Sequence, residues 1–170
     1  SLIELPQPIS NVEISAHSTQ HTVPSCAWRI ATAERPGKFD RDNASNLPTE
    51  VRTRLAAGED VEYEGETLVA TDFRAEVRAG LSVIISGDTA EQAIEAECDL
   101  LIHEATFLNS HTDLASEHLH STAAGAARTA MECGAKHLAL THYSARLENL
   151  ETSVEEAQAI HDSVVACNDG

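Results

Sequence analysis

With 170 residues and a net charge of −17, the chain is strongly acidic and long enough for one globular domain with a hydrophobic core. The acidity argues against broad nonspecific binding to nucleic acids, which attract basic surfaces. No stretch approaches the roughly 20 apolar residues of a membrane span, and the start SLIELPQPIS lacks the features of a secretory signal. We therefore expect a soluble, cytoplasmic protein with no membrane partner.

The basic residues are almost all arginines. Of the 11 cationic residues, only Lys38 and Lys136 are lysines. An acidic surface of this kind suits a halophilic protein, because high salt screens the repulsion between like charges over a few ångströms. A nucleic-acid substrate stays possible only if arginines or bound metals create a local positive site. The four cysteines form no C-x-x-C pair, so neither a zinc knuckle nor a dithiol redox motif is expected.

The N-terminal part predicts two strands. Residues 12–18 (VEISAHS) and 26–33 (CAWRIATA) are separated by TQHTVPS, with a turn at Pro24. The following stretch, residues 34–80, is polar, rich in turn residues and only briefly periodic. We interpret it as an irregular excursion from the domain. It is expected to carry a short helix and a small hairpin, at about residues 49–57 and across Glu64-Gly65.

Three later segments share one design. VIISGDT, LLIHEAT and LALTHYS each run apolar for about four residues and then become polar, which is typical of strands covered on both faces. The sequence between and after them predicts helices, with capping-box spacing at Thr89 and Ser153 and a cap at Ser121 or Thr122. Strands that alternate with helices indicate a layered α/β fold. The expected helices lie within residues 89–97, 120–134 and 153–166.

Potential ligands follow these three strands directly. Asp88, the pair His103-Glu104 and His142 stand where the apolar runs end, and ligands of such sheets collect beyond the strand ends. Each residue alone has an ordinary interpretation, since a carboxylate after a strand is often a helix N-cap and a histidine is often a satisfied core or surface residue. Three neighbouring strands that all end in such residues predict that these residues share one site.

Five motifs follow one another along the chain: His21 in QHTVPSCAWRI, Asp88 in SGDT, HEAT at 103–106, HST at 120–122 and THYSAR at 141–146. Their order resembles the C-terminal half of ribonuclease Z, the zinc-dependent endoribonuclease that trims tRNA 3′ trailers. PGKFD and RLAAGEDVEYEGETL also resemble the connecting segment of that family. HEAT followed by HST is specific to ribonuclease Z-like members, whereas GDT and THxS alone indicate only the wider metallo-β-lactamase superfamily.

The resemblance spans essentially the whole of residues 1–170 and implies a fold. The expected fold is α/β, a metallo-β-lactamase-like αββα sandwich of which this chain forms the C-terminal half only, as a mixed sheet with flanking helices. A lone half of such a sandwich exposes a large apolar face. We therefore expect association with a complementary N-terminal half or, as a homo-oligomer, with a second copy of the chain.

The resemblance also implies a metal site for cleavage of the 3′ trailer of precursor tRNA or of another RNA. His21 resembles a ligand of one Zn²⁺ ion, His142 a ligand of the other, and Asp88 a carboxylate that bridges both, so a complete site holds two Zn²⁺. Neutral imidazoles and carboxylates are ligands suited to zinc. Two metals roughly 3.5–4 Å apart can hold the attacking and the leaving oxygen of a phosphodiester.

The remaining motif residues resemble the catalytic and substrate-binding groups of the family. His120 resembles the acid that protonates the leaving 3′-oxygen, and Glu104 the carboxylate that orients it. Ser144 and Arg146 resemble a loop near the substrate phosphate, although Arg146 also fits a surface salt bridge. His103 is expected to be structural or to support a metal ligand.

One family motif is missing from the sequence. No two histidines have the HxHxDH spacing with an Asp between them, and His118 and His120, which belong to the HST region, come closest. In the family this motif supplies three histidine ligands and the aspartate expected to act as general base. Three protein ligands divided over two zinc ions leave each ion short of donors. We therefore expect the chain to be incomplete without an HxHxDH-bearing half. Two alternatives stay open: a non-catalytic remnant or partner subunit of the same fold, and a different metallo-β-lactamase-type phosphodiesterase.

Overall fold

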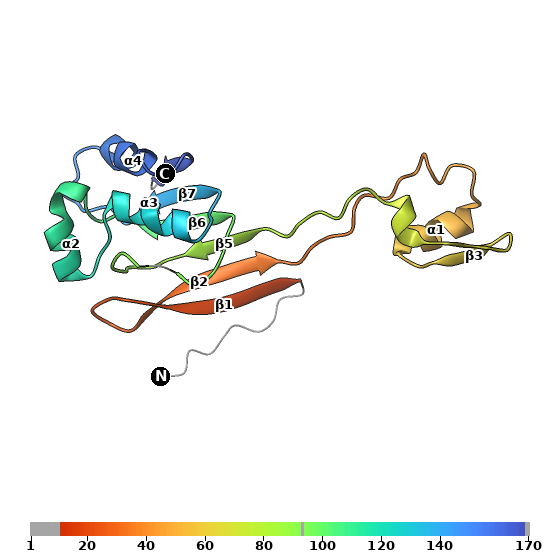
Figure 1. Cartoon of the computed structure of the whole chain (residues 1–170), viewed down its shortest axis with the longest axis horizontal. Helices are drawn as coiled ribbons and strands as arrows, with labels where there is room; N and C mark the ends of the chain where they lie inside the picture. The colour runs from red at the N-terminus through yellow and green to blue at the C-terminus, as the bar shows by residue number, and fades with distance from the viewer. Residues whose placement is uncertain (1–10, 93, 169–170) are drawn as a thin grey trace. The chain divides into compact units, whose positions relative to one another are not determined.

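The computed structural model describes residues 11–92 and 94–168. The chain divides into two compact units, one comprising residues 1–33 and 81–170, here the sheet unit, and one comprising residues 34–80, here the insert unit (Figure 1). Within the described residues, no helix combines the length and the apolar character needed to cross a membrane. Each unit is described by itself.

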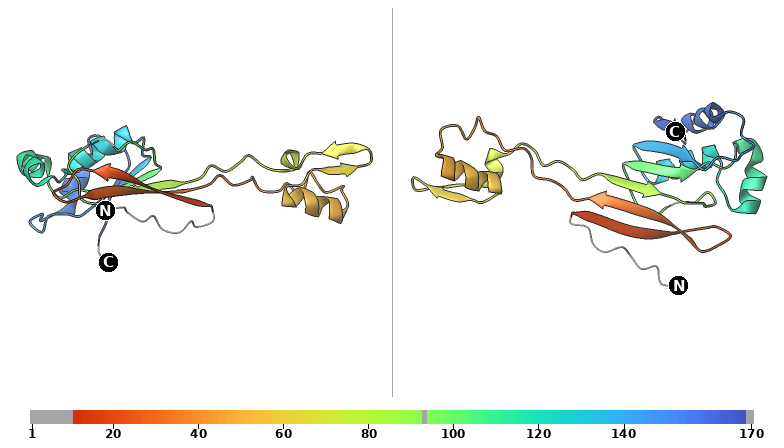
Figure 2. Two further views of the ribbon diagram at one scale, coloured as in Figure 1. Left: turned by 90° about the horizontal axis from the view of Figure 1, so that it is seen from below. Right: turned by 180° about the vertical axis from the view of Figure 1, so that it is seen from behind.

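Six strands of the sheet unit lie side by side in the order β1-β2-β5-β6-β7-β8 (Figures 1 and 2). The pairs β1-β2 and β2-β5 are antiparallel, whereas β5, β6, β7 and β8 run parallel. The prediction of a mixed sheet is therefore confirmed. The strands are β1 (Val12–Thr19), β2 (Ser25–Thr32), β5 (Ser82–Ile85), β6 (Leu100–Glu104), β7 (His137–Thr141) and β8 (Val164–Ala166).

Flanking helices build the core on one face of the sheet. The alanine-rich α3 packs with Leu101 and Leu138 in one buried cluster that also contains Ala157 of α4. The N-cap of α3 is Thr122, whose side chain accepts a hydrogen bond from Gly125 N, so one of the two predicted caps is confirmed. The helical segments are α2 (Thr112–His118), preceded by the 3₁₀ turn η2 (Asn109–His111), α3 (Ala123–Glu132) and α4 (Leu150–Gln158).

The predicted helix over residues 89–97 is wrong. No helix forms among the described residues of this stretch, which runs as bends and irregular chain. Its polar groups bond elsewhere: Thr89 N donates to Glu104 Oε1, and Ala90 N donates to Gln20 O. Long-range contacts with β6 and the β1-β2 turn thus replace the local capping box, because propensity is a weak guide where tertiary contacts compete.

The last predicted helix is also corrected. Helix α4 begins after Asn149, whose side chain accepts from Glu151 N, rather than at Ser153, which lies buried inside the helix. The chain after α4 returns to the sheet as β8. His161 organises this return, since its Nε2 donates to Ala135 O and its Nδ1 accepts from Ser163 N.

The opposite face of the sheet is apolar and is here called the open sheet face. Residues paired across neighbouring strands lie on the same face, and the register Trp28-Ile85-Ile102-Ala139-Val165 forms one apolar row across β2, β5, β6, β7 and β8. Ile85 is 39% exposed and Val165 59% exposed, whereas their neighbours Ile84 and Val164 lie in the helix-side core. A second apolar row of this face comprises Ile14, Ile30, Val83 and Leu100.

The insert unit contains the predicted short helix and hairpin. Helix α1 (Thr49–Ala57) ends at Gly58, which is left-handed at φ 91°, and the strands β3 (Val61–Tyr63) and β4 (Glu66–Leu68) pair across a two-residue turn. The turn residues Glu64 and Gly65 both have positive φ, as a tight hairpin turn requires. A 3₁₀ turn, η1 (Ala70–Phe73), follows, and a small core forms around Leu55, Val61 and Ala70.

The sheet unit contains a carboxylate that links three segments. Asp99 accepts hydrogen bonds from Lys136 Nζ at 2.6 Å and from Ser82 N at 2.7 Å. The Lys136 ammonium, followed by the Ser82 N–H, lowers the pKa of Asp99 to about 2. Because the pKa is depressed relative to the ordinary value of about 3.9, the stabilisation is complete above about pH 4 and is lost as the pH falls toward 2.

We expect Asp99→Asn to lower the thermal unfolding midpoint at neutral pH by roughly 1–4 °C, because the amide keeps an acceptor but loses the ion pair. The difference from wild type should shrink as the pH is lowered from about 4 toward 2. Calorimetry across this range measures it. Asp113→Asn, on the exposed part of α2, is the matched control. A difference that grows with acidification contradicts the assignment.

Candidate metal and catalytic site

The parallel strands bring the predicted residues to one edge of the sheet. Asp88 follows β5, Glu104 ends β6, and His142 comes directly after β7. Since β5, β6 and β7 are adjacent and parallel, their carboxyl ends meet at this edge. His142 has a left-handed backbone at φ 52°, a conformation that costs energy for a non-glycine residue and is often found at functional sites.

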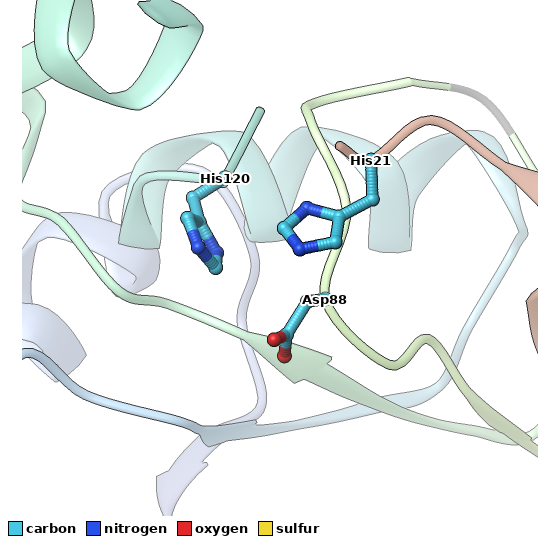
Figure 3. Close-up of side chains that lie close together, drawn as sticks. All are labelled: His21, Asp88 and His120. Carbon is cyan, nitrogen blue, oxygen red and sulfur yellow. The ribbon is translucent and has the colours of Figure 1, made fainter. Parts of the chain in front are cut away.

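Three side chains form the centre of the site. His21, Asp88 and His120 each offer a ligand atom, and these atoms lie within 4.8 Å of one another. Figure 3 shows the two imidazole rings facing the Asp88 carboxylate from different segments of the chain. His142 Nε2 lies 3.5 Å from Asp88 Oδ1. The three residues predicted as metal ligands, His21, Asp88 and His142, are thus brought together, with His120 beside them.

The orientation of His21 is fixed by the end of α2. Its Nδ1 donates to the Leu119 carbonyl at 2.9 Å, which leaves Nε2 as the free ring nitrogen. Leu119 adopts a left-handed conformation at φ 55° as the C-cap of α2. This turn therefore aims the Leu119 carbonyl at His21 and places His120 next in the chain. A hydrogen bond from one ring nitrogen to a carbonyl is the usual support of a metal-binding imidazole.

Glu104 is a buried carboxylate with a full set of donors. It is 1% exposed. Oε1 accepts from Thr89 N at 2.9 Å and from His120 Nδ1 at 2.7 Å, and Oε2 accepts from Thr106 N at 3.2 Å and from the Thr106 hydroxyl at 2.6 Å. Because an ionised carboxylate only accepts hydrogen bonds, four donors match the charged form and compensate its burial.

His120 stands between this carboxylate and the other imidazoles. Its ring stacks on His142 at a centroid distance of 5.5 Å and meets His21 edge-on at 4.9 Å. Since Nδ1 is held by Glu104, Nε2 is the nitrogen left for chemistry. His120 lies two residues before Thr122, the N-cap of α3, so the start of this helix fixes its place in the chain.

His103 lies apart from the metal-ligand groups in the core. It is fully buried, and its Nδ1 donates to the Glu104 carbonyl at 2.8 Å. Burial lowers the pKa of His103, so the ring is neutral at physiological pH. Within the described part of the chain, its Nε2 has no hydrogen-bond partner. Its bond to the backbone of Glu104 supports the end of β6.

Ser144 and Arg146 lie beside the site rather than in the imidazole cluster. Both line a cavity of about 130 Å³ that Thr106 also borders. Ser144 N donates to Thr106 O at 3.2 Å, and the Ser144 hydroxyl accepts from Arg146 N at 3.3 Å. The loop is thereby attached to the end of β6. The cavity is also lined by His111 and by Phe107, Leu108, Leu114 and Leu147, and the last four give it an apolar wall.

Two residues of the site were not predicted as site residues. One is Thr106, the last residue of the HEAT motif, whose hydroxyl contacts Glu104, His120 and His142. Leu119 contributes through a carbonyl and a left-handed backbone. A signal for Thr106 was present in the motif, whereas no sequence pattern marks Leu119, because a backbone carbonyl is common to every residue.

The sequence was compared with those of known proteins. No family model matches the chain. The ribonuclease Z of Haloferax volcanii is 37% identical over 159 residues, covering 88% of this chain and 50% of the relative. The ribonuclease Z of Haloarcula marismortui is 38% identical over 171 residues, covering 95% and 55%, respectively. The chain spans about half the length of the curated relatives that it matches.

Solved structures show the fold. The metallo-β-lactamase fold protein YhfI from Bacillus subtilis matches with a TM-score of 0.60 and 19% identity, over 98% of this chain and 51% of that protein. The short form of human tRNase Z matches with a TM-score of 0.54 and 23% identity, over 96% and 43%, respectively. The sheet and helices described above are therefore part of a metallo-β-lactamase fold, and the sequence of this chain is similar to about half the length of ribonuclease Z from several organisms.

Proposed function

We propose that this chain is the C-terminal half of a zinc-dependent endoribonuclease that cleaves the 3′ trailer of precursor tRNA. The proposal rests on two groups of residues that lie next to each other. One is a cluster of metal ligands centred on Asp88, and the other is the His120 imidazole, whose Nδ1 lies 2.7 Å from Oε1 of the buried Glu104. Metal ligands beside an oriented proton donor are what hydrolysis of a phosphodiester needs. Ribonuclease Z relatives from several organisms support the choice of substrate.

The donor set suits zinc. Neutral imidazoles with a free Nε2 and a carboxylate are ordinary zinc ligands. Two ligands of a tetrahedral zinc, each at about 2.1 Å, lie roughly 3.4 Å apart, and the 3.5 Å between His142 Nε2 and Asp88 Oδ1 fits this spacing. We assign His21 and His142 to different ions, with Asp88 shared. Bound zinc would supply a Lewis acid for the phosphate oxygens and lower the pKa of a water molecule.

His120 is the proposed proton donor. As the phosphorus gains the oxygen of water, the bond from phosphorus to the 3′-oxygen breaks, and His120 Nε2–H delivers a proton to that leaving oxygen. Glu104 accepts a hydrogen bond from Nδ1–H, which keeps the ring in position for the transfer. The proton of the attacking water goes to a base outside this donor set, in the HxHxDH-bearing half.

RNA recognition by this acidic chain requires local positive charge. Seven of the 11 cationic residues lie in the insert unit, at Arg35, Lys38, Arg41, Arg52, Arg54, Arg74 and Arg78. In the sheet unit, Arg128 and Lys136 are paired with Glu91 and Asp99. The insert unit also carries 11 acidic residues, so its net charge is negative and it is not a positive patch. We assign Arg146, at the cavity beside the site, to the substrate phosphate, with Ser144. The acidic remainder suits a halophilic, cytoplasmic enzyme.

The open sheet face indicates how the site is completed. It offers a continuous apolar surface, and the relatives are about twice as long as this chain. We propose that a complementary N-terminal half packs a second sheet against it and brings the missing ligands to the same edge. A second copy of this chain would cover the face without supplying an HxHxDH motif, so the complementary half is the favoured partner.

Reconstitution tests the proposal. The chain is mixed, in high salt with zinc, with the part of the Haloferax volcanii ribonuclease Z that it does not cover, and a precursor tRNA carrying a 3′ trailer is added. We expect co-elution of the two parts and cleavage that leaves a 3′-hydroxyl, with His120→Ala lowering the rate by about 10²–10⁴-fold. A co-eluting, zinc-loaded complex that leaves the RNA intact would overturn the endonuclease assignment and favour a non-catalytic partner subunit.

A further inference from the structure

A single hydroxyl connects the groups of the site. Thr106 Oγ1 lies 2.6 Å from Glu104 Oε2, 2.9 Å from His142 Nδ1 and 3.2 Å from His120 Nδ1. It also lies 3.1 Å from the backbone carbonyl of His142. Among the described residues, no other side chain forms hydrogen bonds both with the predicted acid pair and with a predicted metal ligand.

The proton of this hydroxyl can go to only one of these groups. Glu104 accepts hydrogen bonds from four donors, and the contact of its Oε2 with Thr106 Oγ1 is the shortest that the hydroxyl makes. If the hydroxyl proton pointed elsewhere, two oxygens with lone pairs would face each other at 2.6 Å inside a buried site, which is unfavourable. The hydroxyl therefore donates to Glu104 and has only lone pairs left for its other neighbours.

The direction of this hydrogen bond determines the tautomer of His142. With its proton given to Glu104, Thr106 Oγ1 accepts from His142, and Nδ1 of that ring must carry the hydrogen. In the neutral ring Nε2 then has the lone pair, and it is Nε2 that lies 3.5 Å from Asp88 Oδ1. In the other tautomer an N–H would gain only a long contact of 3.5 Å with Asp88 Oδ1, whereas the lone pairs of Nδ1 and Thr106 Oγ1 would meet at 2.9 Å, which is the larger cost.

We propose that Thr106 is a positioning residue that fixes His142 as the Nδ1–H tautomer and thereby presents Nε2 as a metal ligand. The same hydroxyl holds Glu104 Oε2 while Oε1 holds His120, so one residue aligns the metal ligand and the proton donor together. The importance for catalysis rests on the proposed function. The tautomer does not, because it follows from hydrogen bonds within this chain.

The tautomer is measured by long-range ¹H–¹⁵N NMR correlation on the metal-free, ¹⁵N-labelled chain, at alkaline pH where imidazoles are neutral. We expect the His142 ring of wild type and of Thr106→Ser to show protonated Nδ1 and unprotonated Nε2. Thr106→Val, which replaces the hydroxyl with a methyl of similar size, should give a mixture of tautomers. A wild-type His142 with its proton on Nε2, or an unchanged tautomer in a folded Thr106→Val, overturns the proposal.

Zinc binding gives a second readout that does not depend on turnover. Loss of such a supporting hydrogen bond typically lowers metal affinity about 10–100-fold, and we expect this for Thr106→Val, with recovery in Thr106→Ser. Thr53→Val, which removes an exposed threonine hydroxyl from α1, is the matched control and should bind like wild type. Equal affinity for Thr106→Val and Thr53→Val counts against the positioning role. Failure of the RNA cleavage assay alone would affect only the proposed function.

Discussion

Replacement of His142 by alanine is expected to reduce zinc binding at least about 100-fold and to abolish RNA cleavage by the reconstituted enzyme. The side chain faces Asp88 at 3.5 Å with its Nε2, and its removal leaves the shared carboxylate without a neighbour on that side. The left-handed backbone of His142 should become less favourable to hold once the Thr106 contact is lost. Isothermal titration with zinc and a single-turnover cleavage assay measure the two effects.

The same strand offers the control. His137 begins β7 and His142 follows its end, so the two imidazoles stand at opposite ends of one strand. His137 is exposed and bonds to the Ser163 hydroxyl through Nδ1 at 2.8 Å. We expect His137→Ala to keep wild-type zinc affinity and turnover. Equal losses in the two variants would show that the effect comes from damage to β7 rather than from a lost ligand.

Glu104→Gln is expected to have the second large effect, on both stability and rate. The substitution replaces one of the two acceptor oxygens with an NH₂ group. In one orientation this NH₂ group faces the donors of Thr89 and His120, and in the other it faces those of Thr106. Donors left unpaired in a site that is 1% exposed should cost about 2–4 kcal/mol in the free energy of unfolding. Loss of orientation at His120 should lower the cleavage rate about 10²–10⁴-fold.

Urea denaturation gives the stability difference, and single-turnover kinetics give the rate. Glu156→Gln is the matched control, because Glu156 also accepts a backbone N–H, from Asn109 at 2.8 Å, but at the protein surface. It should change the free energy of unfolding by less than about 1 kcal/mol. A Glu104→Gln variant as stable and as active as Glu156→Gln would mean that the buried carboxylate orients nothing.

The strand ends could be predicted because the signal there is strong and local. Apolar runs that stop at Asp88, Glu104 and His142 already imply strands whose tips lie together, and the structure has them adjacent and parallel. The helix expected from Thr89 onward failed for a reason outside the local sequence. Its first N–H is used by Glu104, a residue 15 positions later, and no capping pattern reports such a contact.

The finer organisation of the site depends on tertiary contacts in the same way. The tautomer of His142 follows from Thr106, and the orientation of His21 follows from Leu119, which lies 98 positions later in the chain. Sequence patterns identify residue types that can bind a metal. They do not contain the proton positions, which depend on groups that meet only after folding.

The parallel strands that gather these residues also determine when the site can exist. His21 and His142 stand far apart along the chain, and each pair of parallel strands is joined through a long crossover, so the folding contacts are largely non-local. Chains of high contact order fold slowly, because long loops must close before their contacts form. No short segment can hold His21, Asp88 and His142 together before the sheet assembles. A metal that binds this cluster will therefore select the folded state, and it will raise the unfolding temperature as its concentration rises.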